Sequence, residues 1–139
     1  MSGTLVEGGL QIAGGISLII GLGHTAFYRM FGWKRDLARI SPLNVKILMT
    51  IHIATTILLL FLGVLTIRFS SQLSQNTEIA SSICLALSLF WGWRLIWQVI
   101  YFRPSTIEHD NKLLMLHYSL ITMFGVLAIA YAAPLIASS

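Results

Sequence analysis

The sequence predicts an all-α fold, an integral membrane bundle of four antiparallel transmembrane helices. Hydrophobic residues make up 56% of the 139 positions, and Asp, Glu, Lys and Arg together only 10%, against about 25% charged residues in an ordinary soluble domain. The mean hydropathy is +0.81. Four apolar runs each reach the roughly 20 residues that a helix needs to cross a bilayer. These observations exclude a soluble enzyme, a nucleic-acid binder and a disordered regulator.

The four runs leave no room for a second domain, so residues 1–139 are expected to form one domain. Because lipid offers no hydrogen-bond partners to the backbone, each run must be helical. The N-terminal segment carries one charge, Glu7, before residue 29 and lacks the basic start of a signal peptide, so the first run is expected to remain in the mature protein. In chain order, the predicted spans are residues 10–30, 43–67, 79–101 and 113–133.

Polar segments separate the spans. In the first loop, Pro42 stands where a new helix can begin without losing a needed hydrogen bond. The middle loop, residues 70–77, is polar and nearly uncharged. In the third loop, Pro104 is followed by Ser105 and, three residues later, Glu108, a pattern typical of a capping box before the fourth helix.

Lys and Arg predict the orientation, because they gather on the cytoplasmic side of membrane proteins. Seven of them flank the first and third loops, and one lies at the opposite side. In a bacterial inner membrane, both termini are therefore expected on the side away from the cytoplasm. The seven are Arg29, Lys34, Arg35, Arg39, Lys46, Arg103 and Lys112, and the single opposing residue is Arg68.

Aromatic residues follow the same asymmetry. Trp33, Trp93, Trp97 and Tyr101 are expected to form a belt at the cytoplasmic interface, where amphipathic rings are enriched. Trp91 is expected to face lipid with Trp93 and Trp97.

Three of the four histidines lie within predicted spans, and the fourth, His109, is expected in a loop. From the span ends, His24, His52 and His117 lie roughly 7 to 10 Å below the cytoplasmic boundary at 1.5 Å per residue. The antiparallel arrangement therefore predicts three imidazoles at nearly one level, with Arg94 and Gln98 at a similar depth.

Residues at helical spacing place these polar groups on inward-facing stripes. Small residues in the stripes allow close helix approach or leave room for a flat cofactor, and packing is the expected role of the glycines and of Cys84. The stripes are Gly14, Ser17, Gly21, His24 and Tyr28 on the first span, Met49, His52, Thr56, Leu59 and Gly63 on the second, and Cys84, Ser88, Trp91, Arg94 and Gln98 on the third.

Ionisable groups inside a membrane usually face an interior or a cavity, so these residues form the candidate site. Haem b needs two imidazoles from facing helices, and Arg94 can balance its propionates. A transition metal would use all three span histidines, with Met49 or Met115 as a further ligand. The predicted cofactor-binding residues are His24, His52, His117, Arg94, Tyr28 and Gln98, and the predicted metal ligands are His24, His52 and His117.

Other chemistries stay open at this point. A quinone head group could accept hydrogen bonds from a histidine, Tyr28 or Gln98, and imidazoles could relay protons because they titrate near neutrality. A carboxylate-bridged di-iron site is disfavoured, since no Asp or Glu lies within a span. The structural alternative is that the histidines only form interhelical hydrogen bonds and that Arg94 extends to the interface.

The expected function is that of a small redox-associated membrane protein, an electron carrier or subunit, holding one haem b or a transition metal. The alternative is a non-catalytic accessory subunit of a larger respiratory or photosynthetic complex, without a cofactor. A pore is a third possibility that would require oligomerisation. The expected partners are the lipid bilayer and either further copies of the chain or a larger membrane complex, and no nucleic acid.

The residues also resemble a known family. The stretch from His24 through Tyr28, Trp33 and Asp36, followed by Pro42-Leu43-Asn44 and His52, is similar to a family of small bacterial four-span membrane proteins with intramembrane histidines. The later Arg94, Gln98 and His117 match its second half. The resemblance covers nearly the whole chain and implies a fold and a histidine pattern, not an activity. A looser similarity to b-type cytochrome bundles is limited to helix number and histidine use, and at most one haem fits it.

Overall fold

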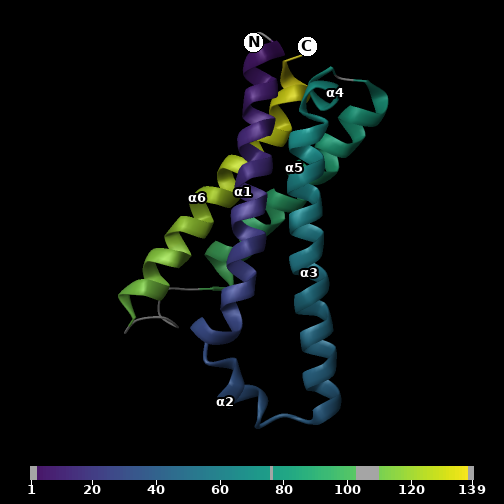
Figure 1. Ribbon diagram of the computed structural model, residues 1–139. Coiled ribbons are helices and arrows are strands. Elements are labelled where there is room, and N and C mark those ends of the chain that lie inside the picture. The colour runs from purple at the N-terminus through teal and green to yellow at the C-terminus, as the bar shows by residue number, and fades with distance from the viewer. Residues whose placement is uncertain (1–2, 76, 103–109, 138–139) are drawn as a thin grey trace. The chain divides into compact units, whose positions relative to one another are not determined.

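The computed structural model describes residues 3–75, 77–102 and 110–137, and all regular structure within them is α-helical (Figure 1). Four of the helices are long and apolar enough to cross a membrane, which confirms the predicted fold class. The protein is therefore a multi-pass membrane protein. The helices are α1 (Gly3–Met30), α2 (Trp33–Leu37), α3 (Pro42–Arg68), α4 (Ser70–Ser74), α5 (Glu78–Ile100) and α6 (Asn111–Ile136).

The starts of the long helices follow local hydrogen bonding. α3 begins at Pro42 as predicted, and the Ser41 hydroxyl accepts a hydrogen bond from the Asn44 amide at 3.3 Å. The Thr77 side chain caps α5 in the same way. Asp110 caps α6 by accepting from the amides of the first helical turn. The predicted capping box at Ser105 and Glu108 lies outside the described residues.

Two segments that the sequence predicts as loops contain short helices. Gly32 adopts a left-handed conformation, with φ of 64°, and lets the chain turn from the end of α1 into α2. In the middle loop, α4 buries Leu73 and Ser70. Helical turns in these polar segments pair backbone amide and carbonyl groups with one another. A helix of five residues is too short to show an amphipathic pattern in the sequence.

The chain divides into two compact units, which we call the α1–α3 unit (residues 14–68) and the α5–α6 unit (residues 1–13 and 69–139). Within the α1–α3 unit, the two long helices approach closely at glycines and run in opposite directions. A Cβ atom on Gly14 would lie 2.8 Å from the Gly63 carbonyl oxygen, and one on Gly21 would lie 2.9 Å from a methyl carbon of Leu60. These glycines therefore serve helix packing, as predicted.

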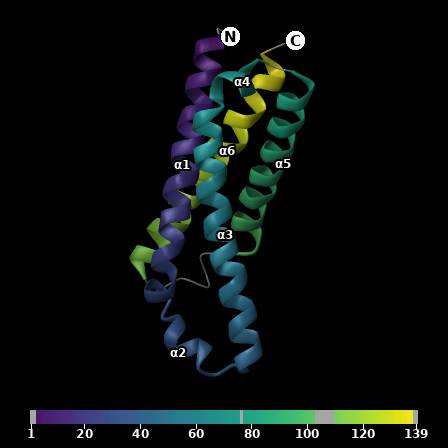
Figure 2. The same cartoon turned by 45° about the vertical axis from the view of Figure 1, so that its right-hand side comes forward.

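In the α5–α6 unit, α5 and α6 also run in opposite directions. The Ser88 hydroxyl donates to the Ala128 carbonyl oxygen at 3.0 Å, and ten residues further along α5, Gln98 bonds His117. The start of α1, α4 and the end of α6 lie at the same end of this unit in both views (Figures 1 and 2), and the Ser70 hydroxyl bonds Glu7 there at 3.5 Å. An antiparallel arrangement of all four spans together stays a prediction.

Hydroxyl groups on the outer faces of the long helices bond to their own backbone. Thr50 and Ser119, for example, donate to carbonyl oxygens four residues earlier at 2.8 Å. Such bonds satisfy a polar group that faces lipid. The large exposed side chains around them are mostly aliphatic, as a lipid-facing surface requires.

Candidate functional site

The predicted site residues fall into one group in each unit. His24 and His52 lie in the α1–α3 unit, and Arg94, Gln98 and His117 lie in the α5–α6 unit. The prediction that all three span histidines share one level involves residues of both units, and it stays a prediction.

The structure brings His24 and His52 together across α1 and α3. Their ring centroids are 5.8 Å apart, and their planes differ by 22°. His24 Nδ1 lies 2.9 Å from the Ile20 carbonyl oxygen. Since a carbonyl can only accept, Nδ1 carries the proton, and in the neutral ring Nε2 is the nitrogen with the lone pair. A backbone carbonyl on the second ring nitrogen is the usual way in which a metal-binding histidine is oriented.

Aromatic rings pack around this pair. Phe27, one turn after His24, has its centroid 4.4 Å from the His24 ring and 6.1 Å from the His52 ring. Trp33, the first residue of α2, meets His52 edge to face at 4.8 Å. The sequence analysis assigned Trp33 to the interfacial belt alone. Its contact with His52 depends on α2, which the polar loop composition did not indicate.

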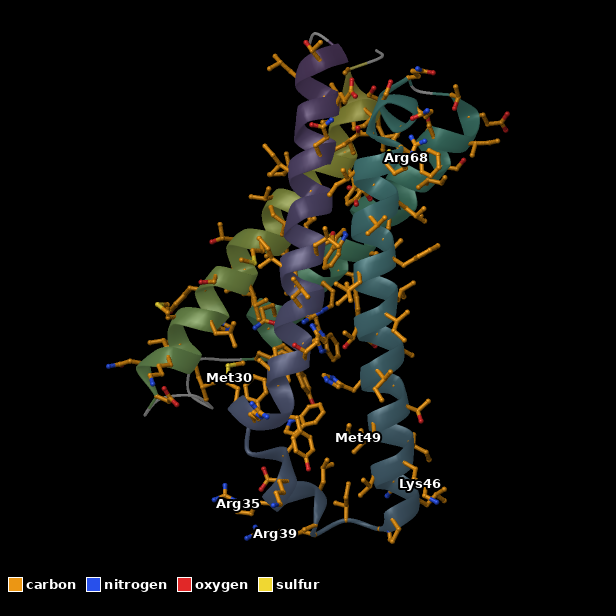
Figure 3. All side chains as sticks on the ribbon, in the orientation of Figure 1. Met30, Arg35, Arg39, Lys46, Met49 and Arg68 are labelled. Atoms are coloured by element: carbon orange, nitrogen blue, oxygen red, sulfur yellow. The ribbon has the colours of Figure 1, made fainter. Side chains whose placement is uncertain are left out.

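Two further residues of the predicted stripes lie near the pair. Met49 precedes His52 by one turn and lies on the side of α3 toward α1 (Figure 3). Tyr28 follows His24 by one turn but is 38% exposed, and no ring contact between Tyr28 and either histidine occurs in the described part of the chain. Tyr28 is thus at the edge of the site, not within it.

The second group is a hydrogen-bonded chain between α5 and α6. Arg94 Nη2 donates to Gln98 Oε1 at 3.4 Å, and Gln98 Nε2 donates to His117 Nδ1 at 3.0 Å. The chain has one consistent polarity, because arginine and an amide nitrogen only donate. His117 therefore accepts at Nδ1 and, in its neutral form, carries its proton on Nε2. Gln98 and His117 are buried, at 5% and 3% exposed.

Trp91 differs from its expected lipid-facing placement, and Arg94 does not follow the alternative in which its side chain extends to the interface. The Arg94 guanidinium does not extend along lipid to the interface; its central carbon lies 4.6 Å from the Phe124 ring centroid. Trp91, which was expected to face lipid with the belt residues, is only 2% exposed. Its ring stacks on Phe124, with the centroids 5.6 Å apart. Its place on the third stripe, with Cys84 and Gln98, is the signal that favoured burial. Cys84 itself is fully buried, as predicted.

Within the described residues, no three His, Cys, Asp or Glu side chains gather in a way that could hold a metal ion. A methionine ligand is outside that set. A shallow hollow on the α1–α3 unit is lined by Gly32, Lys34 and Arg35 and contains none of the predicted site residues. No protein-family model, curated protein or solved structure matches the chain. The residues of the two groups therefore carry the functional argument alone.

Proposed function

We propose that this is a small redox-associated membrane protein that binds one transition-metal ion through His24 and His52. The observation that carries the proposal is the 5.8 Å separation of the two rings. A metal ion lies about 2 Å from a ligating histidine nitrogen, so two rings that share an ion have centroids roughly 5 to 6 Å apart.

The orientation of His24 supports the same reading. Its Nδ1 proton is directed to the Ile20 carbonyl, so in the neutral ring Nε2 carries the lone pair with which a histidine binds a metal. The two imidazoles do not complete a coordination shell. Met49 supplies a thioether on the same face of α3 as His52, and imidazole with thioether is a ligand set that suits copper. Copper changes oxidation state readily, which fits a redox role. An electron carrier or subunit of this kind needs no substrate domain.

Haem b fits this pair less well than an ion. A haem would place a flat macrocycle between the two imidazoles. Phe27 and Trp33 pack against those rings at 4.4 and 4.8 Å and would have to be displaced. His117, the third predicted ligand, uses Nδ1 to accept from Gln98, so it would have to bind a metal through Nε2 after changing tautomer.

The charge distribution supports a bacterial inner-membrane orientation with the α1–α2–α3 turn in the cytoplasm and both termini outside. Arg35, Arg39 and Lys46 lie at one end of the α1–α3 unit and Arg68 at the other (Figure 3). A periplasm-dependent reporter fused at Ser139 should be active. Activity of a cytoplasm-dependent reporter at that position would contradict this orientation.

The proposed function is tested by purification in detergent, with metal content measured by mass spectrometry and a visible spectrum recorded. We expect about one copper or other transition-metal ion per chain, lost in His24→Ala and in His52→Ala. His109→Ala is the matched control and should keep the metal. A Soret band that is present in the unaltered protein and lost in the same variants would show that the bound cofactor is haem b and not a single metal ion. A metal-free, colourless protein that co-purifies with a larger complex would favour the accessory subunit instead.

A further inference from the structure

A group of polar and aromatic side chains in the α5–α6 unit is linked by ring contacts to Phe124 and by hydrogen bonds through Gln98. We call it the Arg94 cluster: Trp91, Arg94, Gln98, His117 and Phe124. Trp91 stacks on Phe124 at 5.6 Å, and the Arg94 guanidinium lies 4.6 Å from the same ring. The cluster thus lines several nitrogen groups along the contact between α5 and α6.

Two N–H donors of this cluster are buried without a hydrogen-bond partner among the described residues. They are Nη1 of Arg94 and Nε1 of Trp91. A buried donor without an acceptor costs about 1 to 3 kcal/mol, more for a charged group. Such groups are rare in folded proteins and indicate a bound water, ion or ligand. Both residues contact the Phe124 ring, so an acceptor group that enters between α5 and α6 beside that ring would satisfy them.

Neither donor bonds to the remaining side chains of the cluster. Gln98 Oε1 already accepts from Arg94 Nη2, and Gln98 Nε2 donates to His117. The polarity of that chain leaves His117 Nε2 as another donor. A ligand that fits the cluster therefore presents several acceptor oxygens and needs no donor of its own.

Within the described part of this unit, no carboxylate forms an ion pair with Arg94. Of the acidic residues described in this unit, Glu7 is bonded by the Ser70 hydroxyl and Asp110 caps α6. Glu78 is in the first turn of α5, sixteen residues before Arg94 and about 24 Å away along the helix. A charge within a membrane span is normally paired, so the ligand that fits best is an anion.

Side chains typical of the membrane interface flank the cluster along the chain. Trp93, Trp97 and Tyr101 form a stacked ladder on α5, with centroids 5.9 and 4.8 Å apart. All three are exposed. Aromatic rings of this kind mark the membrane interface, and Arg94 lies between the first two in sequence, within one helical turn of both.

We propose that the Arg94 cluster binds the phosphate of an anionic phospholipid. Arg94 Nη1 and Trp91 Nε1 donate to the phosphate oxygens, and the guanidinium balances the negative charge. Gln98 and His117 are positioning residues, because they hold Nη2 and leave Nη1 directed to the ligand. Basic pockets between transmembrane helices are known to bind lipid head groups in this way.

The test uses the full chain in detergent, stripped of lipid and then mixed with phosphatidylglycerol or phosphatidylcholine. Native mass spectrometry measures the bound lipid, and the thermal midpoint measures stabilisation. We expect one phosphatidylglycerol per chain and a higher midpoint with phosphatidylglycerol than with phosphatidylcholine. Arg94→Gln should weaken phosphatidylglycerol binding about ten-fold or more, as expected for a lost charge-assisted hydrogen bond.

Two further variants keep the test informative if Arg94→Gln fails to fold. Trp91→Phe keeps an aromatic ring and removes only the donor, and it should weaken binding several-fold. Arg39→Gln removes the same charge from an exposed position and should leave binding unchanged. Equal binding of the two lipids to the unaltered protein would overturn the proposal, as would equal effects of Arg94→Gln and Arg39→Gln. Recovery of a bound quinone in place of phospholipid would overturn it in favour of a carbonyl ligand.

Discussion

Close packing of α1 against α3 makes Gly14 intolerant of any side chain. A Cβ atom at this position would lie 2.5 Å from Ile67 Cγ1 and 2.8 Å from the Gly63 carbonyl oxygen. The Ile67 side chain can rotate, but the carbonyl oxygen belongs to helix backbone and can move only if the helices separate. Overpacking of this kind costs about 1 to 3 kcal/mol, so Gly14→Ala should lower the thermal midpoint by roughly 3 to 10 °C.

Gly15 provides the matched control, because a Cβ atom there meets nothing within 4 Å. Gly15→Ala makes the same chemical change one residue along the same helix and should leave the midpoint unchanged or raise it slightly through better helix propensity. Thermal unfolding in mild detergent, followed by circular dichroism and tryptophan fluorescence, measures both variants. Equal midpoints for the two variants would refute the argument that a close backbone approach defines this unit.

Three other predictions concern the α5–α6 unit. Ser88→Ala removes the hydrogen bond to the Ala128 carbonyl and should cost about 0.5 to 1 kcal/mol, measured by the same thermal unfolding; an unchanged midpoint would contradict the bond. Nitrogen chemical shifts of His117 should show the tautomer with the proton on Nε2, whereas a proton on Nδ1 would contradict the direction of the Gln98 bond. Cys84 is fully buried, so a thiol-reactive fluorophore should label it only on unfolding; rapid labelling of the folded protein would disprove that burial.

Hydrophobicity and helical spacing were sufficient to predict the fold class and the contact between two of the candidate residues, His24 and His52. The four apolar runs correspond to the four long helices, and the pairing of His24 with His52 agrees with their similar predicted depths below the same boundary. The glycines on the same stripes lie where α1 and α3 touch. Each of these predictions depends only on period and depth, which a single sequence contains.

The remaining features depend on tertiary contacts that no local pattern encodes. Whether Arg94 extends to the interface or turns inward is decided by Phe124 on another helix, thirty residues away in sequence. The burial of Trp91 has the same cause. Trp33 reaches His52 because Gly32 allows the turn into α2, and a polar loop sequence does not specify that turn.

The central claim is that His24 and His52 hold one metal ion. The most direct measurement is a titration of the metal-free protein with Cu(I) in the presence of a competing chelator of known affinity. The proposal predicts one tightly bound ion per chain, with affinity reduced at least ten-fold in His52→Ala and unchanged in His109→Ala. Binding that is absent, or that is equal in all three proteins, would contradict it.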